Sequence, residues 1–105
     1  MGKIWNDRLA LHDYLLEISG TENVYFQPPE SVKLKYPAIV YSLNNIGNVP
    51  ADNITYVQNV SYMITVIDRM PDSELAEKIS MIPHIVFGRS YVADNLNHFV
   101  FTLFV

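Results

Sequence analysis

The chain has 105 residues and no cysteine. It can therefore form no disulfide, offer no thiolate to a metal and perform no thiol catalysis, and it suits a reducing compartment. Basic residues are also few. The chain has seven Lys and Arg, which form no cluster, and eleven Asp and Glu. Its formal net charge is −4. Because sequence-independent binding of nucleic acid needs a basic surface that releases counterions, DNA and RNA are not expected as direct ligands.

Long apolar runs are absent too. No stretch approaches the roughly 18 apolar residues of a membrane-spanning helix. Asp7, Arg8, Asp13 and Glu17 interrupt what would be the apolar part of a secretion signal. A soluble, non-secreted protein is expected. Half of the residues are hydrophobic, enough for one domain over residues 1–105 that buries roughly 65% of its unfolded surface.

Motifs for catalysis and cofactor binding are missing as well. The four glycines are isolated from one another, so there is no Gly-rich phosphate loop, and no Ser lies in a Gly-x-Ser-x-Gly elbow. The three histidines, His12, His84 and His98, are far apart, and none has the spacing of a metal motif. The sequence predicts no enzyme, no cofactor, and no catalytic, cofactor-binding or metal residues.

One compact acidic group, Asp68, Asp72 and Glu74, surrounds Pro71 and has two interpretations. Carboxylates are the ligands that hard cations prefer. They also stabilise the N-terminus of a helix, and a helix is expected to begin at this point. Capping accounts for Asp72 and Glu74 without any ligand, and we favour it.

The first half of the chain predicts a helix over residues 4–19. Leu11, Leu15 and Ile18 fall at helical spacing, and Trp5, Leu9 and Leu16 widen the apolar face. Gly20 can end this helix, because positive φ costs glycine nothing.

Residues 21–36 are predicted to form an extended surface loop, because prolines punctuate the segment. Val24–Phe26 could still make a short strand. Residues 22–27 resemble a viral protease site that is used in expression tags, but Val24 and Pro28 depart from that site. The segment also lies inside the chain, so we treat it as native sequence and part of the fold.

The middle of the chain predicts a strand, a loop and a long strand. Residues 38–43 form a short apolar strand, and residues 44–53, rich in Asn with Gly47 and Pro50, form a loop. From Tyr56 to Ile67 the pattern alternates, with an apolar even face from Val60 and a mixed odd face.

At Pro71 the period changes from 2 to 3.6, which predicts a second helix. Its N-terminal residues are Asp72, Ser73 and Glu74, its buried stripe is Leu75, Ile79 and Ile82, and Pro83 stops it.

Two further strands are predicted at residues 85–92 and 98–105, with a hairpin loop at 93–97. The last strand is apolar on both faces and uncharged, so it should lie inside the sheet or be covered by a partner. The expected class is α+β. It has an antiparallel or mixed sheet of about four to five strands and two helices packed on one face.

Three segments together resemble one protein family. They are Tyr36-Pro37-Ala38-Ile39-Val40-Tyr41, the stretch from Tyr62 to Glu74 with its Asp-Arg-x-Pro-Asp-Ser-Glu turn, and Ala93-Asp94-Asn95-Leu96-Asn97-His98. They are similar to the tail terminator (tail completion) proteins of phages with long non-contractile tails, especially those that infect Gram-positive bacteria. The resemblance covers nearly the whole chain, but it rests on strand and turn patterns rather than catalytic signatures.

The resemblance implies a structural protein of the virion. Such proteins assemble as a hexameric ring that caps the finished tail tube, ends its polymerisation and presents a docking face to the head. The implied partners are the chain itself, the tail tube protein and the head-completion or connector protein. DNA would pass through the lumen without specific binding. The implied location is the junction of tail and neck, and the host cytoplasm during assembly.

Three alternatives remain open. One is a head-closure protein of the neck, an adaptor or stopper. Another is a small ligand-binding or enzymatic domain of the host, which would need a concave pocket with convergent titratable groups. The third is a regulatory partner, which would stay a monomer in solution. In the virion roles, the segments 22–36 and 44–53 are the loops expected to meet neighbouring proteins.

Overall fold

The structure is a computed structural model, and it describes residues 8–50 and 56–104. The elements follow the order α2 (Arg8–Ser19), β1 (Val24–Phe26), β2 (Ala38–Pro50), β3 (Tyr56–Asp68), α3 (Glu74–Ser80), β4 (Ile85–Ala93) and β5 (Leu96–Phe104). The strands form one sheet in the order β1-β2-β3-β5-β4. All neighbouring pairs are antiparallel except β1 with β2, which is parallel. The α+β class and the mixed sheet are confirmed.

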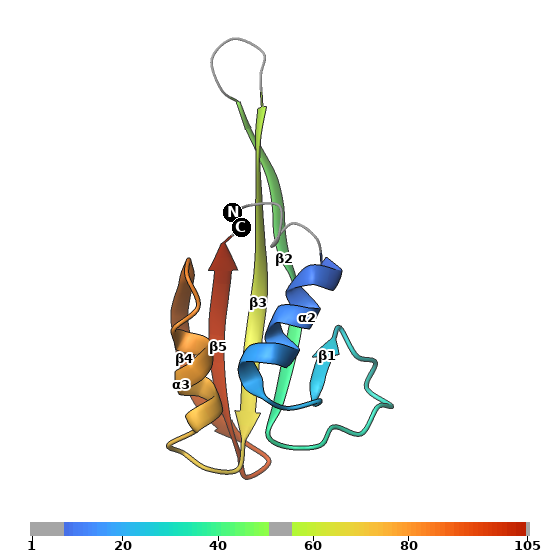
Figure 1. The fold of residues 1–105 in the computed structure, drawn as a ribbon, viewed down its shortest axis with the longest axis vertical. Coiled ribbons are helices and arrows are strands. Elements are labelled where there is room, and N and C mark those ends of the chain that lie inside the picture. Colours follow the sequence, from blue (N-terminus) through green and yellow to red (C-terminus); the bar gives the residue numbers. More distant parts are fainter. Residues whose placement is uncertain (1–7, 51–55, 105) are drawn as a thin grey trace.

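The core lies between the two helices and the sheet, and both helices are drawn in front of the sheet in Figure 1. Alternate residues of β3 enter the same buried cluster as side chains from both helices. The cluster includes Leu11 and Leu15 from α2, Leu75 and Ile79 from α3, and Tyr62, Ile64 and Val66 from β3. Alternation along a strand puts such residues on one face, so we call this the core face. The opposite face, which carries Met63 and Thr65, is the open face.

The two helices follow the sequence pattern with one exception. Leu11 and Leu15 are fully buried, and Gly20 has φ +69° after the last turn of α2. Leu9, expected on the apolar face, is 62% exposed, so that part of the prediction is wrong. The expected stripe of Leu75, Ile79 and Ile82 is buried, although α3 ends at Ser80. Residues 4–7 of the predicted first helix lie outside the described residues.

The predicted loop at residues 44–53 is wrong for its first seven residues. β2 continues to Pro50 and pairs with β3 through Pro50 and Tyr56. A register shift between Leu43 and Asn45 marks the point where the apolar part of the strand gives way to its Asn-rich part. A ladder of backbone hydrogen bonds needs no particular side chains, so polar composition alone did not reveal this strand. The remainder, residues 51–53, falls outside the described part.

The segment 21–36 is not loop throughout, because Val24–Phe26 forms β1. Val24 pairs with Ile39 and is buried, while the Phe26 ring lies 5.0 Å from that of Tyr41. Residues 24–26 of the tag-like segment are therefore built into the sheet, and Val24 is part of its core.

The last two strands are joined by a tighter turn than residues 93–97 predicted. Only Asp94 and Asn95 connect β4 to β5, with φ of +53° and +63°. Positive φ at both central positions is the geometry of a type I′ hairpin turn, for which Asn and Asp are favoured. β5 begins at Leu96 and lies between β3 and β4, so the uncharged strand is an interior strand.

Candidate functional site

The three segments that carry the family resemblance meet at one end of the sheet. Ala38 pairs with Ile67, and Ile67 pairs with His98 on its other side. The side-chain amide of Asn97 lies 3.4 Å from the carbonyl oxygen of Asp68 and 3.3 Å from that of Arg69. Segments that are distant in the sequence thus support one another, and the turn from β3 to α3 is at their centre.

A hydrogen-bond network explains the residue types of that turn. The Asp68 carboxylate accepts a bond from the Met70 N–H at 3.1 Å and from the Ser73 hydroxyl at 2.7 Å. Ser73 accepts from the Ala76 N–H at 3.1 Å, which makes it the N-cap of α3. Both Asp68 and Ser73 are buried. The N-cap was predicted within residues 72–74, but the bond that joins it to Asp68 was not.

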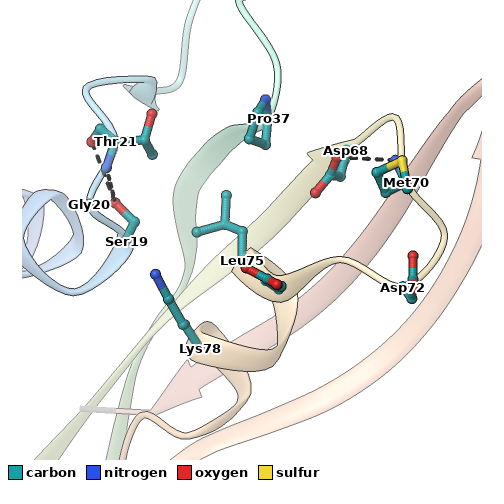
Figure 2. Close-up of a pocket in the computed structure, with 10 residues that line it drawn as sticks. Ser19, Gly20, Thr21, Pro37, Asp68, Met70, Asp72, Leu75 and Lys78 are labelled. Carbon is teal, nitrogen blue, oxygen red and sulfur yellow. Dashed lines mark hydrogen bonds between the residues drawn. The ribbon is translucent and has the colours of Figure 1, made fainter.

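The acidic group that the sequence singled out lines an open pocket of about 460 Å³ between the end of α2 and the start of α3 (Figure 2). Asp68 uses both carboxylate oxygens within the turn. Asp72 and Glu74 are exposed near the N-terminus of α3, and Lys78 also lines the pocket. Acids at a helix N-terminus are stabilised by the helix dipole, so this arrangement is satisfied without a ligand.

The histidines occupy three separate environments. The His12 Nδ1 atom lies 2.7 Å from the Tyr41 hydroxyl in the core, and His84 is exposed before β4. His98 stacks on Tyr91 with ring centroids 4.6 Å apart, and its Nδ1 donates to the Leu96 carbonyl at 3.1 Å. Within residues 8–50 and 56–104, no group of three His, Cys, Asp or Glu side chains could hold a metal.

The surroundings of Tyr41 perturb its titration. Burial raises the pKa of the Tyr41 phenol, and a hydrogen bond and the charge of Arg8 oppose that rise. Burial therefore favours the neutral phenol, whose oxygen lies 2.7 Å from the His12 Nδ1 atom. Arg8 also lies over the Phe26 ring, 4.6 Å from its centroid. The group ties α2 to β1 and β2, which is a structural role.

Charge is almost absent from the sheet. Among the residues of the five strands only Asp68 and Arg89 are charged. Arg89 lies over the Tyr91 ring, 5.2 Å from its centroid. The other charged residues of the described chain lie on helices, turns and loops.

Large apolar side chains are exposed around β4, the last strand in the sheet order. Its residues from Val86 to Val92 are all exposed. Val86, Phe87, Tyr91 and Val92 expose between 41% and 69% of their surface, and Phe104 of β5 exposes 54%. The sequence predicted that the last strand lies inside the sheet or is covered by a partner, and it made no such prediction for residues 85–92. Residues 85–92 are also largely apolar, but composition does not show which of the two strands forms the edge of the sheet.

Comparisons with known proteins identify no relative: no family model matches the chain, and no curated protein matches it significantly. In the part of the chain that the structure describes, neither helix could cross a bilayer, since both are too short or too polar.

Proposed function

We propose that this protein is a structural component of a phage virion, a ring-forming terminator that caps the tail tube and offers the head a docking face. The observation that carries the proposal is the resemblance of the three segments to tail terminators. Those segments are not scattered motifs, because they fold against one another at one end of the sheet. The Asp-Arg-x-Pro-Asp-Ser-Glu turn is the most distinctive of them.

The surface chemistry agrees with this role. A ring subunit needs two different contact surfaces that are satisfied head to tail when the ring closes. Exposed apolar side chains around β4 form such a candidate surface. An acidic chain would also not grip the phosphates of DNA moving through the lumen.

The polar residues of the β3–α3 turn have a structural role, so the resemblance does not require them to bind a partner or a ligand. Asp68 and Ser73 build the turn and cap α3, so their chemistry is used within the fold. The proposal therefore assigns no catalytic residue, cofactor or metal. Recognition of tube and connector would rest on surfaces instead.

A binding experiment separates the terminator from the alternative neck role. The tagged protein is offered assembled tail tubes, the portal protein and the neck adaptor of the same phage in parallel pull-downs. We expect retention of tubes, because a terminator binds the tube end. Retention of portal or adaptor without tubes would assign the chain to head closure. Failure to bind any of the three would refute a role at the tail-neck junction.

A further inference from the structure

We propose that the free edge of β4 pairs with the free outer edge of β2 in a second copy of this chain, which joins subunits head to tail. The inference rests on the proposed ring and names the surface that builds it. The two edges are β4 from Ile85 to Ala93 and β2 from Asn44 to Pro50. They belong to strands on opposite sides of the sheet, so neither can satisfy the other within one copy.

The β2 edge belongs to the hairpin of residues 45–50 and 56–60, which we call the arm. β3 pairs with β5 only from Ser61 onward, and β1 covers β2 only from Ile39 to Tyr41. The hairpin of residues 45–50 and 56–60 therefore has two strands and no third among the described residues. In Figure 1 it projects beyond the rest of the sheet. A two-stranded ribbon is marginally stable in water and needs a third strand or a covering element.

Gln27 makes the last hydrogen bonds to the outer edge of β2, at Tyr41 and Leu43. Its backbone N–H donates to the Tyr41 carbonyl at 2.9 Å, and its side-chain oxygen accepts from the Leu43 N–H at 3.1 Å. Beyond Leu43 no strand of the described chain pairs with the outer side of β2. Within residues 8–50 and 56–104, the outer backbone edge of β2 from Asn44 onward therefore has no paired strand.

The β4 edge is apolar, and no strand of the described residues pairs with its outer side. Phe87, Tyr91 and Phe104 each expose about half of their surface. Aromatic side chains bury roughly 150–250 Å² each, so these rings alone expose on the order of 300 Å². By strand register, Phe87 and Val92 lie on the core-face side of the sheet and Val86, Tyr91 and Phe104 on the open face. Both sides of this edge therefore expose apolar side chains. A long apolar edge of this kind would pair indiscriminately unless it had a specific occupant.

Charge favours a second copy as that occupant. Each copy carries a net charge of −4, so two copies repel unless they meet through uncharged surfaces. Neither edge contains an acid, and Arg89 is the single charge on either of them. A basic partner would gain nothing from such a surface, whereas a copy of the same acidic chain requires it.

Head-to-tail pairing explains more than a symmetric pairing of two β4 edges. A β4–β4 dimer would cover the apolar edge but would leave the arm without a third strand. Pairing β4 with the arm covers the apolar edge and gives the arm its third strand in a single contact. Each copy then keeps one free edge, which can pair with the next subunit. Contacts of this heterologous kind close into rings when the rotation permits. Strand addition at a sheet edge supplies the backbone hydrogen bonds.

The cysteine-free sequence permits a direct test by cross-linking. Asn44→Cys is combined, one at a time, with a cysteine at each position of β4 from 86 to 92. Paired strands bring Cα atoms to about 4.5–5.5 Å, which suits a disulfide. We expect one or two of these double variants to form a ladder of covalent multimers under oxidation. Each single variant should stay uncross-linked.

Two cross-linking results would overturn the head-to-tail contact. Dimers from single β4 cysteines would show a symmetric β4 contact and overturn the proposal. A full scan without ladders would do the same, even if the wild-type protein forms rings by mass, because the ring would then use other surfaces. Tail-tube binding, measured on the same variants, reports on the proposed function separately.

A charge substitution gives a second readout that needs no oxidation. Val92→Lys places a charge on the apolar edge at a site that is 69% exposed, so folding is retained. We expect the concentration for half-assembly to rise about tenfold or more. Met81→Lys, at a site 71% exposed after α3, is the matched control and should leave assembly unchanged. Equal effects of the two variants would count against a contact at β4.

Discussion

Replacing Ser73 by alanine tests the hydrogen-bond network that holds the β3–α3 turn. The Ser73 hydroxyl caps α3 through the Ala76 N–H and donates to the buried Asp68 carboxylate. Losing an N-cap costs about 1 kcal/mol. Leaving a buried acceptor without its donor adds about 1–3 kcal/mol. The free energy of unfolding should therefore fall by about 2–4 kcal/mol, which corresponds to a Tm lower by about 10–25 °C in a domain of this size.

Chemical and thermal unfolding followed by circular dichroism measures this loss, at one fixed protein concentration because assembly would add stability. Ser80→Ala is the matched control. Its hydroxyl bonds only the Glu77 carbonyl on an exposed helix surface, and the change should stay within about 0.5 kcal/mol. Asp68→Ala with Ser73→Ala should cost less than the sum of the single variants. A Ser73→Ala loss no larger than that of Ser80→Ala, or strictly additive losses, would refute the network.

Three further predictions concern the core, a buried phenol and the hairpin turn. Leu15→Ala should lower the free energy of unfolding by about 2–5 kcal/mol because it opens a cavity at a fully buried site, whereas Met81→Ala at an exposed site should change it little in the same denaturant titration. Burial raises the pKa of Tyr41, so its contribution to stability is present below pH about 10 and is lost as the pH rises through the raised value. Stability measured against pH should therefore fall more steeply above pH 10 for the wild type than for Tyr41→Phe, and parallel curves would contradict this. Asn95→Ala should destabilise the hairpin by about 1 kcal/mol because φ is +63° there, while Asn95→Gly should be nearly neutral in thermal unfolding.

Much of the fold followed from sequence periodicity. The alternation of residues 56–67 predicted β3, and the change of period at Pro71 predicted α3. These segments bury one face each, so selection for burial leaves a regular pattern of apolar residues. The uncharged last strand was predicted to lie inside the sheet or to be covered by a partner. The first alternative is confirmed, since β5 has a neighbouring strand on both edges.

The parts that were missed are those where burial gives no pattern. The extension of β2 to Pro50 is made by backbone pairing in a polar segment, and loop composition was a misleading guide there. β1 is only three residues long and depends on its parallel partner β2. Leu9 had the right helical spacing but is 62% exposed, because spacing alone does not show how wide the buried face of a helix is.

The candidate surface was predictable only in part. Low charge in the strands is visible in the sequence, but which strand would be the exposed edge depends on the sheet order. Residues 85–92 and 98–105 have similar apolar composition. Topology alone makes β5 interior and β4 an edge, and periodicity carries no information about that order.

Electron microscopy of tail tubes tests the central claim most directly. Tail tube protein from the same phage is polymerised with and without this protein, and the protein is localised with a gold-labelled tag. We predict a ring of label at one end of each tube and an end to growth once that ring is bound. Tubes that keep growing, with label absent from their ends or scattered along their walls, would contradict the assignment as a tail terminator.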